Sequence, residues 1–179
     1  KIENAEQAIE YVKQHQIQHI KIGLFDLNAV LRSKYISQAK FIKGLHQGLG
    51  FCDVVMGSDF DDQICDALSF TGWHTGFPDS NIQIIPESGR RIPFEPHTLL
   101  FLTEFTEKNN QLCPRNLLKK IIARANEMGF TPYAALEYEF SVFDESSQSI
   151  HDKNFHNLRP ITPGNFGYSV QRNSALSDL

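Results

Sequence analysis

The sequence predicts an α+β protein in which a small mixed sheet packs on a helix. Two patterns carry this prediction: short runs in which apolar and polar residues alternate, and intervening stretches in which apolar residues recur at helical spacing. The chain has 179 residues, of which 41% are hydrophobic and 21% are charged. This composition is typical of a globular protein, and the length suffices for one full domain or for one small domain plus part of another.

A helix and a hairpin come first. Asn4 and Gln7 form a capping pair at the start of an amphipathic stretch, which predicts a helix over about 5–15. Strands are predicted over 20–25 and 30–36. The Asp and Asn residues between these strands tolerate the backbone angles of a turn, so the two strands are expected to form a hairpin.

A second helix and a long loop follow. Ser37 is placed to cap this helix, and Gly48 is placed to end it before a third strand over about 51–56. The stretch 57–80 is rich in Gly and Asp and lacks sustained periodicity, so it is predicted to be a loop with a functional role. Trp73 is expected to be a packing anchor for this loop.

Strands resume at 81–85 and 98–105, and the polar stretch 108–111 is the best candidate for a domain boundary. Pro114 suits the first position of a new helix, and Gly129 suits its end. Six residues make the apolar face of this helix: Leu117, Leu118, Ile121, Ile122, Ala125 and Met128.

The run 133–143 is predicted to be a strand because polar and apolar residues alternate strictly along it. Glu137 and Glu139 then lie on one face, with side chains roughly 6.5 to 7 Å apart. Spacing alone leaves two interpretations open. The pair belongs either to a solvated acidic face of an edge strand or to a site where two hard oxygen ligands bind divalent cations that hold phosphate.

Residues 144–149 are predicted to form a polar turn, and 150–179 show no convincing helix or strand pattern. The helix from Pro114 and the strand after it cannot close a core alone, so the second domain is expected to be incomplete within this chain.

Charge and cysteine content exclude several classes. The formal net charge is -4, and Lys and Arg are dispersed, so no nucleic-acid partner and no membrane surface are expected. The three cysteines are odd in number and lack CxxC spacing, which argues against a disulfide framework or zinc site and favours a cytoplasmic protein. No apolar stretch approaches the ~20 residues of a membrane span.

Five segments taken in order resemble the N-terminal part of the glutamine synthetase family, including the branch that joins glutamate to polyamines or other amines. The segments are 25–34 (FDLNAVLRSK), 57–59 (GSD), 78–79 (PD), 114–118 (PRNLL) and the pair of Gly129 with 137–140 (EYEF). The resemblance implies a β-grasp-like domain over 1–110 and the beginning of a catalytic domain over 111–179. It also implies a homo-oligomeric ring.

The function implied by the resemblance is an ATP-dependent ligase that forms a γ-glutamyl amide from glutamate and ammonia or an amine. ATP phosphorylates the γ-carboxyl of glutamate, and the nitrogen base then displaces phosphate. Mg²⁺ or Mn²⁺ is the implied cofactor, with Glu137 at the ion that assists the nucleotide phosphates and Glu139 at the ion nearer the amino acid. The remaining ATP- and glutamate-binding residues are expected beyond Leu179. The alternative is a non-catalytic relative that keeps the scaffold for binding or regulation.

Asp59 has two interpretations. A Ser-Asp pair after Gly commonly closes a loop. In the family that 57–59 resembles, however, the acidic loop enters the active site of the neighbouring subunit, where a carboxylate attracts an ammonium or amine and accepts its proton. Asp61 and Asp62 are close enough to be that carboxylate instead. The segment 57–59 looks closer to the amine-ligase branch, although the sequence does not name the amine.

Two residues depart from the family pattern. Ala29 stands where many members have Gly, which puts the geometry of the 26–29 turn in question. Cys113 stands where an Asp commonly caps the helix that begins at Pro114, so the start of that helix is expected to be less stable.

Overall fold

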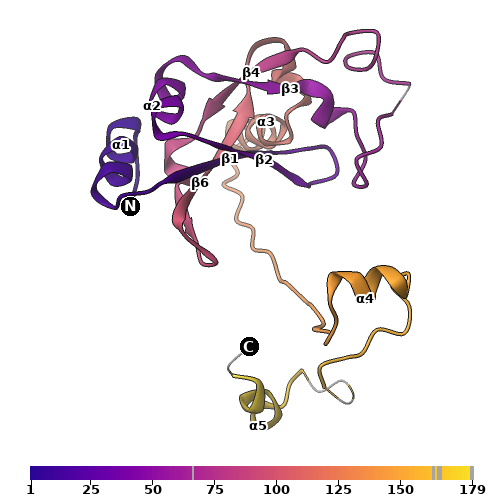
Figure 1. Cartoon of the computed structure of the whole chain (residues 1–179). Helices are drawn as coiled ribbons and strands as arrows, with labels where there is room; N and C mark the ends of the chain where they lie inside the picture. Colours follow the sequence, from indigo (N-terminus) through magenta and orange to yellow (C-terminus); the bar gives the residue numbers. More distant parts are fainter. Residues whose placement is uncertain (66, 163, 165–166, 178–179) are drawn as a thin grey trace. The chain divides into compact units, whose positions relative to one another are not determined.

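The computed structural model describes residues 1–65, 67–162, 164 and 167–177. The chain forms two compact units, Lys1–Pro132 and Tyr133–Leu179 (Figure 1). The first unit combines helices with a mixed sheet, which agrees with the fold class that the sequence predicts. No helix among the described residues is long and apolar enough to cross a membrane.

The first unit is built on a six-stranded sheet with the order β2-β1-β6-β4-β3, and β5 pairs with β6. The strands are β1 (His19–Phe25), β2 (Leu31–Ile36), β3 (Leu49–Cys52), β4 (Asp79–Ile84), β5 (Arg90–Ile92) and β6 (Glu95–Phe105). β1 and β6 run parallel, and the other pairs are antiparallel. The predicted hairpin is confirmed, with Phe25 opposite Leu31 at its closed end.

Both predicted early helices are confirmed with their caps. α1 (Ala5–Gln14) begins after Asn4, whose side chain accepts a hydrogen bond from the backbone N–H of Gln7. α2 (Gln38–Gln47) begins after Ser37 and ends at Gly48, which has a φ of 72°. This left-handed conformation suits glycine because it lacks a Cβ.

The core lies where α1 and α2 cover the sheet. Residues 98–105 of β6 are all buried, which fits a central strand with neighbours on both edges and elements on both faces. Phe101 of this strand packs on Phe41 of α2, with ring centroids 4.7 Å apart. The side chains of Leu99, Phe101 and Phe105 point into this core, because alternate residues of a strand face the same side.

The third strand differs from the prediction. β3 ends at Cys52, and Asp53–Met56 forms a 3₁₀ helix instead of continuing the strand. Within the part of the chain that the structure describes, β3 pairs with β4 alone. The first residue of β4, Asp79, lies opposite Cys52, so the ladder has no further partner residues there in that direction. The short β5 is absent from the prediction, and it forms by pairing back onto β6.

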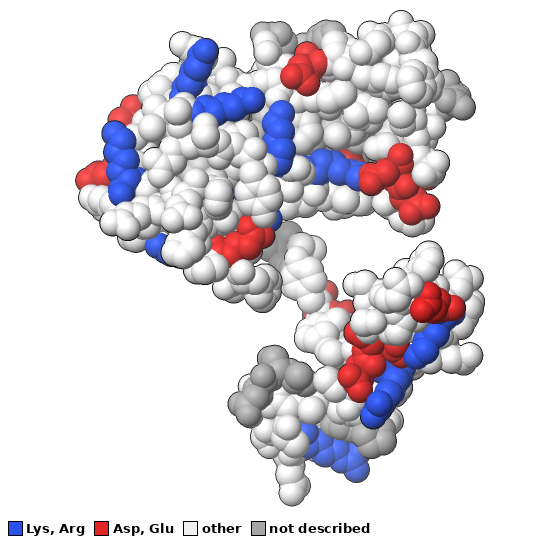
Figure 2. Space-filling view, in the orientation of Figure 1, with Lys and Arg blue, Asp and Glu red and all other residues white. Residues whose placement is uncertain are grey.

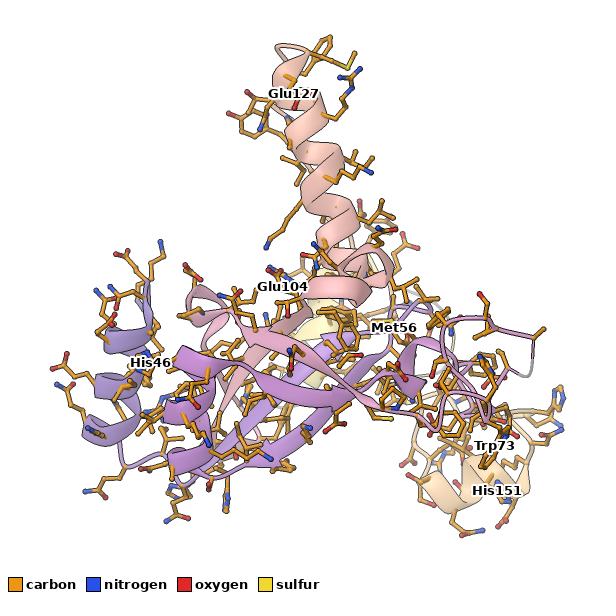
Figure 3. The ribbon with its side chains drawn as sticks, turned by 90° about the horizontal axis from the view of Figure 1, so that it is seen from above. His46, Met56, Trp73, Glu104, Glu127 and His151 are labelled. Atoms are coloured by element: carbon orange, nitrogen blue, oxygen red, sulfur yellow. The ribbon has the colours of Figure 1, made fainter. Side chains whose placement is uncertain are left out.

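The predicted helix at 114 is confirmed as α3 (Pro114–Glu127). Cys113 at its N-cap makes no side-chain capping bond, as expected for a thiol, and is 1% exposed in the core. On the face of the sheet opposite the main core, Glu104 of β6 pairs with Lys119 Nζ at 2.5 Å and lies 3.5 Å from Arg115 Nε. In Figure 3, α3 rises from the sheet near Glu104, and Glu127 marks its far end. Its predicted apolar face is exposed, with Leu118 60% and Ile121 57% accessible.

The predicted strand over 133–143 is wrong. Residues 131–142 have no ladder partner, and Leu136, Tyr138 and Phe140 are 79% to 83% exposed. Only the end of the run is paired, through a bridge between Phe143 and Pro160. A strand requires a neighbour for its backbone N–H and C=O groups, and the described residues supply one only at this bridge.

The rest of the second unit contains two short helices that the sequence pattern does not predict, α4 (Ser147–Asp152) and α5 (Val170–Asn173). Ser146 and Ser149 form a reciprocal capping box at the start of α4. Glu145 receives hydrogen bonds from Ser149 Oγ at 2.6 Å, from Lys153 Nζ at 2.5 Å and from the backbone N–H of Arg159 at 2.6 Å. This carboxylate therefore ties α4 to the segment that follows it.

Candidate functional site

The acidic loop of the first unit, residues 59–63, is closed by the side chain of Asp59. Its Oδ1 accepts hydrogen bonds from the backbone N–H of Asp61 at 2.8 Å and of Gln63 at 2.9 Å. The backbone N–H of Asp59 in turn donates to the carbonyl of Gln63 at 3.0 Å. The turn chemistry predicted for this aspartate is therefore present, and the half-buried carboxylate is held in one place by its own loop.

A buried carboxylate, Asp26, organises the neighbouring β1–β2 turn. It is 1% exposed, and its Oδ1 accepts hydrogen bonds from the backbone N–H groups of Asn28 at 2.8 Å and Val30 at 2.9 Å. Ala29 completes this turn with a φ of 62°, a left-handed conformation that favours glycine. The turn forms with alanine, and the bonds to Asp26 help to hold it.

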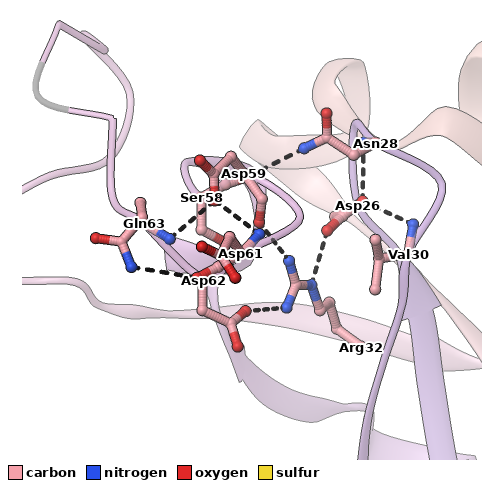
Figure 4. Close-up of polar contacts among 9 residues, drawn as sticks. All are labelled: Asp26, Asn28, Val30, Arg32, Ser58, Asp59, Asp61, Asp62 and Gln63. Atoms are coloured by element: carbon pink, nitrogen blue, oxygen red, sulfur yellow. Dashed lines mark hydrogen bonds and ion pairs between the residues drawn. The ribbon is translucent and has the colours of Figure 1, made fainter. Parts of the chain in front are cut away.

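Arg32 joins the β1–β2 turn to the acidic loop (Figure 4). Its Nε donates to Asp26 Oδ2 at 2.7 Å, and its Nη2 donates to the backbone carbonyl of Asp59 at 2.7 Å. Its Nη1 pairs with the carboxylate of Asp62. Asn28 adds a third link between the hairpin and this region through its Nδ2, which donates to the Ser58 carbonyl at 3.2 Å.

These contacts distinguish the three loop aspartates. Asp62 is paired with Arg32, and its φ of 61° places it in the left-handed region. Asp61 is exposed, whereas Asp59 is half-buried and shapes the turn. The hydrogen bond to Asp26 raises the pKa of Arg32, so the guanidinium remains a fixed positive charge among the carboxylates. Acidic and basic atoms lie side by side in this part of the surface in Figure 2.

A buried hydrogen bond also holds the long loop, residues 57–80, against the first unit. Thr71 Oγ1 donates to Asp53 Oδ1 at 2.7 Å, and both residues are 1% exposed. Trp73, the predicted packing anchor, is 76% exposed and contacts Phe77 edge-on with ring centroids 5.0 Å apart. That prediction is wrong, because a buried polar pair fastens the loop at this point and leaves the indole outside.

Glu137 and Glu139 belong to the second unit, whereas Asp59 belongs to the first. Both glutamates are exposed on the extended run 131–142. Their carboxylates are suitable oxygen donors for Mg²⁺ or Mn²⁺. Within the described part of the chain, however, no three His, Cys, Asp or Glu side chains converge on one point. The two glutamates alone therefore do not make up a cluster of this kind.

Comparison with known proteins gives matches along the whole chain. The chain is 38% identical over 183 aligned residues to type-1 glutamine synthetase 2 of Dictyostelium discoideum, covering 100% of this chain and 35% of that protein. It is 31% identical to glutamate–isopropylamine ligase of a Pseudomonas species, covering 95% of this chain and 38% of that protein. The family model described as "Glutamine synthetase, catalytic domain" matches residues 111–178. The chain is similar to the glutamine synthetase family along its whole length.

Solved structures agree with this family at the level of the fold. A glutamine synthetase of Plasmodium falciparum superposes with a TM-score of 0.52 at 15% identity, over 70% of this chain and 23% of that one. A GmaS/ADP complex superposes with a TM-score of 0.51 at 19% identity, over 68% of this chain and 26% of that one. The chain thus spans roughly a quarter to two fifths of the glutamine synthetase relatives that it matches.

Sequence reasoning identifies Asp59 but misses the two residues that hold its loop. Asp26 and Arg32 both lie inside the segment 25–34 that resembles the glutamine synthetase family. An acid just after one strand and an arginine just inside the next, six residues later, are a signal for an ion pair across a hairpin turn. The bond from Arg32 to Asp59 joins residues 27 apart, so no local pattern indicates it.

Proposed function

We propose that this chain is the N-terminal part of an ATP-dependent ligase that joins glutamate to ammonia or an amine as a γ-glutamyl amide. The observation that carries the proposal is the match of nearly the whole chain to relatives whose names describe such ligases, at 38% and 31% identity. A third relative, the γ-glutamylethanolamide synthetase GlnA4 of Streptomyces coelicolor, is 24% identical over 86% of this chain. These names share glutamate or its γ-glutamyl product and differ in the nitrogen base.

Glu137 and Glu139 are proposed as ligands of two divalent ions, Mg²⁺ or Mn²⁺. Both glutamates are exposed and only one residue separates them, so both carboxylates are accessible to ions that further ligands would complete. Such ions neutralise the crowded oxygens of the nucleotide phosphates and the glutamate carboxylate.

Asp59 is proposed to attract the ammonium form of the amine and to accept its proton. Asp59 Oδ1 accepts from two backbone N–H groups, so Oδ2 is the oxygen that would accept from the amine. The exposed carboxylate of Asp61, two residues away, adds negative charge that favours a cation. The segment 57–59 favours a glutamate–amine ligase over a strictly ammonia-using enzyme.

The proposed assembly is a homo-oligomeric ring in which the Asp59 loop enters the active site of the next subunit. The proposed domains are a β-grasp-like domain over 1–110 and the start of the catalytic domain over 111–179. A hairpin, a helix and a last strand parallel to the first strand support the β-grasp assignment. The start of the family match at residue 111 supports the boundary.

The test of the function is turnover by the full-length protein with ATP, Mg²⁺, glutamate and a panel of amines that includes ammonia. Phosphate release that requires both glutamate and an amine is the expected result. The 179-residue chain alone is expected to show none. Phosphate release without any dependence on glutamate would contradict the proposal. No turnover with any amine would also contradict it and would favour a non-catalytic scaffold.

Two isosteric variants test the metal ligands. Glu137→Gln and Glu139→Gln remove one negative charge each from an exposed run, so folding should change little. A loss of a few kcal/mol in transition-state stabilisation lowers turnover by a factor on the order of 10² or more. The measurement is turnover against Mg²⁺ and Mn²⁺ concentration. Glu127→Gln, at the exposed end of α3, is the control for loss of a carboxylate. Wild-type turnover at limiting metal in both variants would show that the two glutamates do not bind the catalytic ions.

A further inference from the structure

We infer that Arg32 is a positioning residue that fixes the loop bearing Asp59, so that the Asp59 carboxylate meets the incoming amine in one orientation. The catalytic consequence rests on the proposed ligase function, whereas the effect on the loop does not. Arg32 lies in β2, outside the acidic loop, and acts on the carboxylate through the backbone.

The guanidinium of Arg32 bonds to three points on two segments of the chain. Nε reaches Asp26 Oδ2 in the β1–β2 turn, and Nη2 reaches the carbonyl of Asp59, each at 2.7 Å. Nη1 reaches the carboxylate of Asp62 at the far side of the acidic loop. A planar guanidinium presents these donors in a rigid fork, so fixing one bond fixes the directions of the other two.

Burial makes this fork rigid. The Arg32 side chain is 15% exposed, and the Asp26 side chain that orients it is 0% exposed. Asp26 is itself held by two backbone N–H groups of the turn. The orientation of the guanidinium is therefore set by the sheet, because the turn connects β1 and β2 directly.

Arg32 holds the acidic loop at two points, Asp59 and Asp62. The bond from Nη2 holds the peptide of Asp59, which is the residue whose carboxylate is proposed to meet the amine. The pair with Nη1 holds Asp62 in its left-handed conformation, with a φ of 61°. Between these points, Asp59 Oδ1 accepts from Asp61 and Gln63, so the position of the carboxylate follows the position of the turn.

A lysine cannot do the same. One ammonium keeps the positive charge but cannot direct separate donors at Asp26, Asp59 and Asp62. Arg32→Lys therefore separates positioning from charge. A role of Arg32 in local charge balance alone predicts that lysine substitutes well, whereas a positioning role predicts that it does not.

The first arm of the test is amide hydrogen exchange on this chain, a measurement that does not require enzymatic activity. In Arg32→Lys, the protection of the Asp61 and Gln63 amides should fall at least tenfold while the amides of β6 keep theirs. Arg124→Gln removes a guanidinium from an exposed pair on α3 and is the matched control, with no change expected in the loop. Asp62→Asn, which removes only an exposed partner carboxylate, should give a smaller loss in the same amides. Unchanged protection of Asp61 and Gln63 in both Arg32→Lys and Asp62→Asn overturns the inference.

The second arm is steady-state kinetics of the full-length protein. Arg32→Lys should raise the KM for the amine about tenfold and leave the KM for glutamate unchanged. In an Asp59→Asn background it should have no further effect, because a residue that acts through Asp59 is not additive with its removal. Equal changes in both KM values, or additive effects, contradict positioning. If the protein has no ligase activity, the proposed function fails, and the exchange arm alone decides the inference.

Discussion

Replacing Asp26 with asparagine tests how much one buried carboxylate contributes to the first unit. The amide side chain would keep an oxygen for the N–H groups of Asn28 and Val30 but would turn its own NH₂ group toward Arg32 Nε, so that two donors face each other. Breaking a buried ion pair costs about 3–5 kcal/mol. Because Arg32 keeps its bonds to Asp59 and Asp62, we expect a smaller loss of about 2–3 kcal/mol in the free energy of unfolding.

The matched control is Asp62→Asn, which removes the other carboxylate from the same guanidinium. The Asp62 side chain is 78% exposed, so the expected loss is below about 1 kcal/mol. Urea unfolding of the chain, followed by far-UV circular dichroism, measures both variants. With an m-value of about 1–3 kcal/mol/M, Asp26→Asn should lower the midpoint by roughly 0.7–3 M. Equal shifts for the two variants would refute the argument that burial decides the contribution of each carboxylate.

Three further predictions follow from single contacts. Ala29→Gly should stabilise the first unit by about 0.5–1 kcal/mol in urea unfolding, because the φ of 62° strains alanine more than it costs glycine in chain entropy. Thr71→Val should cost about 1–3 kcal/mol in the same assay, because Asp53 loses its buried donor; no loss would mean that water replaces the hydroxyl. In the second unit, the Lys153 ammonium, with Ser149 and the Arg159 N–H, lowers the pKa of Glu145 from 4.5 to about 2. Because the pKa of Glu145 is lower in the folded state, the ionised carboxylate stabilises the folded second unit. This stabilisation is complete above about pH 4.5 and is lost as the pH falls toward 2. Protection of the α4 amides should follow that window, and Glu145→Gln should remove the dependence.

The elements that the sequence predicts well are those whose signals are local. Asn4 and Ser37 cap their helices through contacts three residues away, and the β1–β2 hairpin is closed by its own turn. The short β5 escapes prediction because Arg90 and Arg91 do not alternate with apolar residues and depend on β6 for their pairing. Residues 133–143 have the pattern of a strand, but a pattern alone provides no partner for the backbone.

The candidate site divides in the same way. Asp59 is predicted from a short segment, and the structure shows the turn chemistry that the segment indicates. Arg32 is not predicted, because its contact with Asp59 depends on how the β1–β2 turn and the acidic loop meet in space. The functional roles of Asp59, Glu137 and Glu139 stay predictions that the experiments above test.

The parallel pairing of β1 with β6 has a consequence for the order in which the sheet forms during synthesis. His19 pairs with Thr98, so about 80 further residues must be synthesised after β1 before β6 is available to pair with it. At ~5–20 residues per second, that delay is roughly 4 to 16 s. During it, the β1–β2 hairpin has an open edge and an apolar face without a core, which is the condition in which strands pair with the wrong chain. The first unit thus depends on its last strand to protect its first.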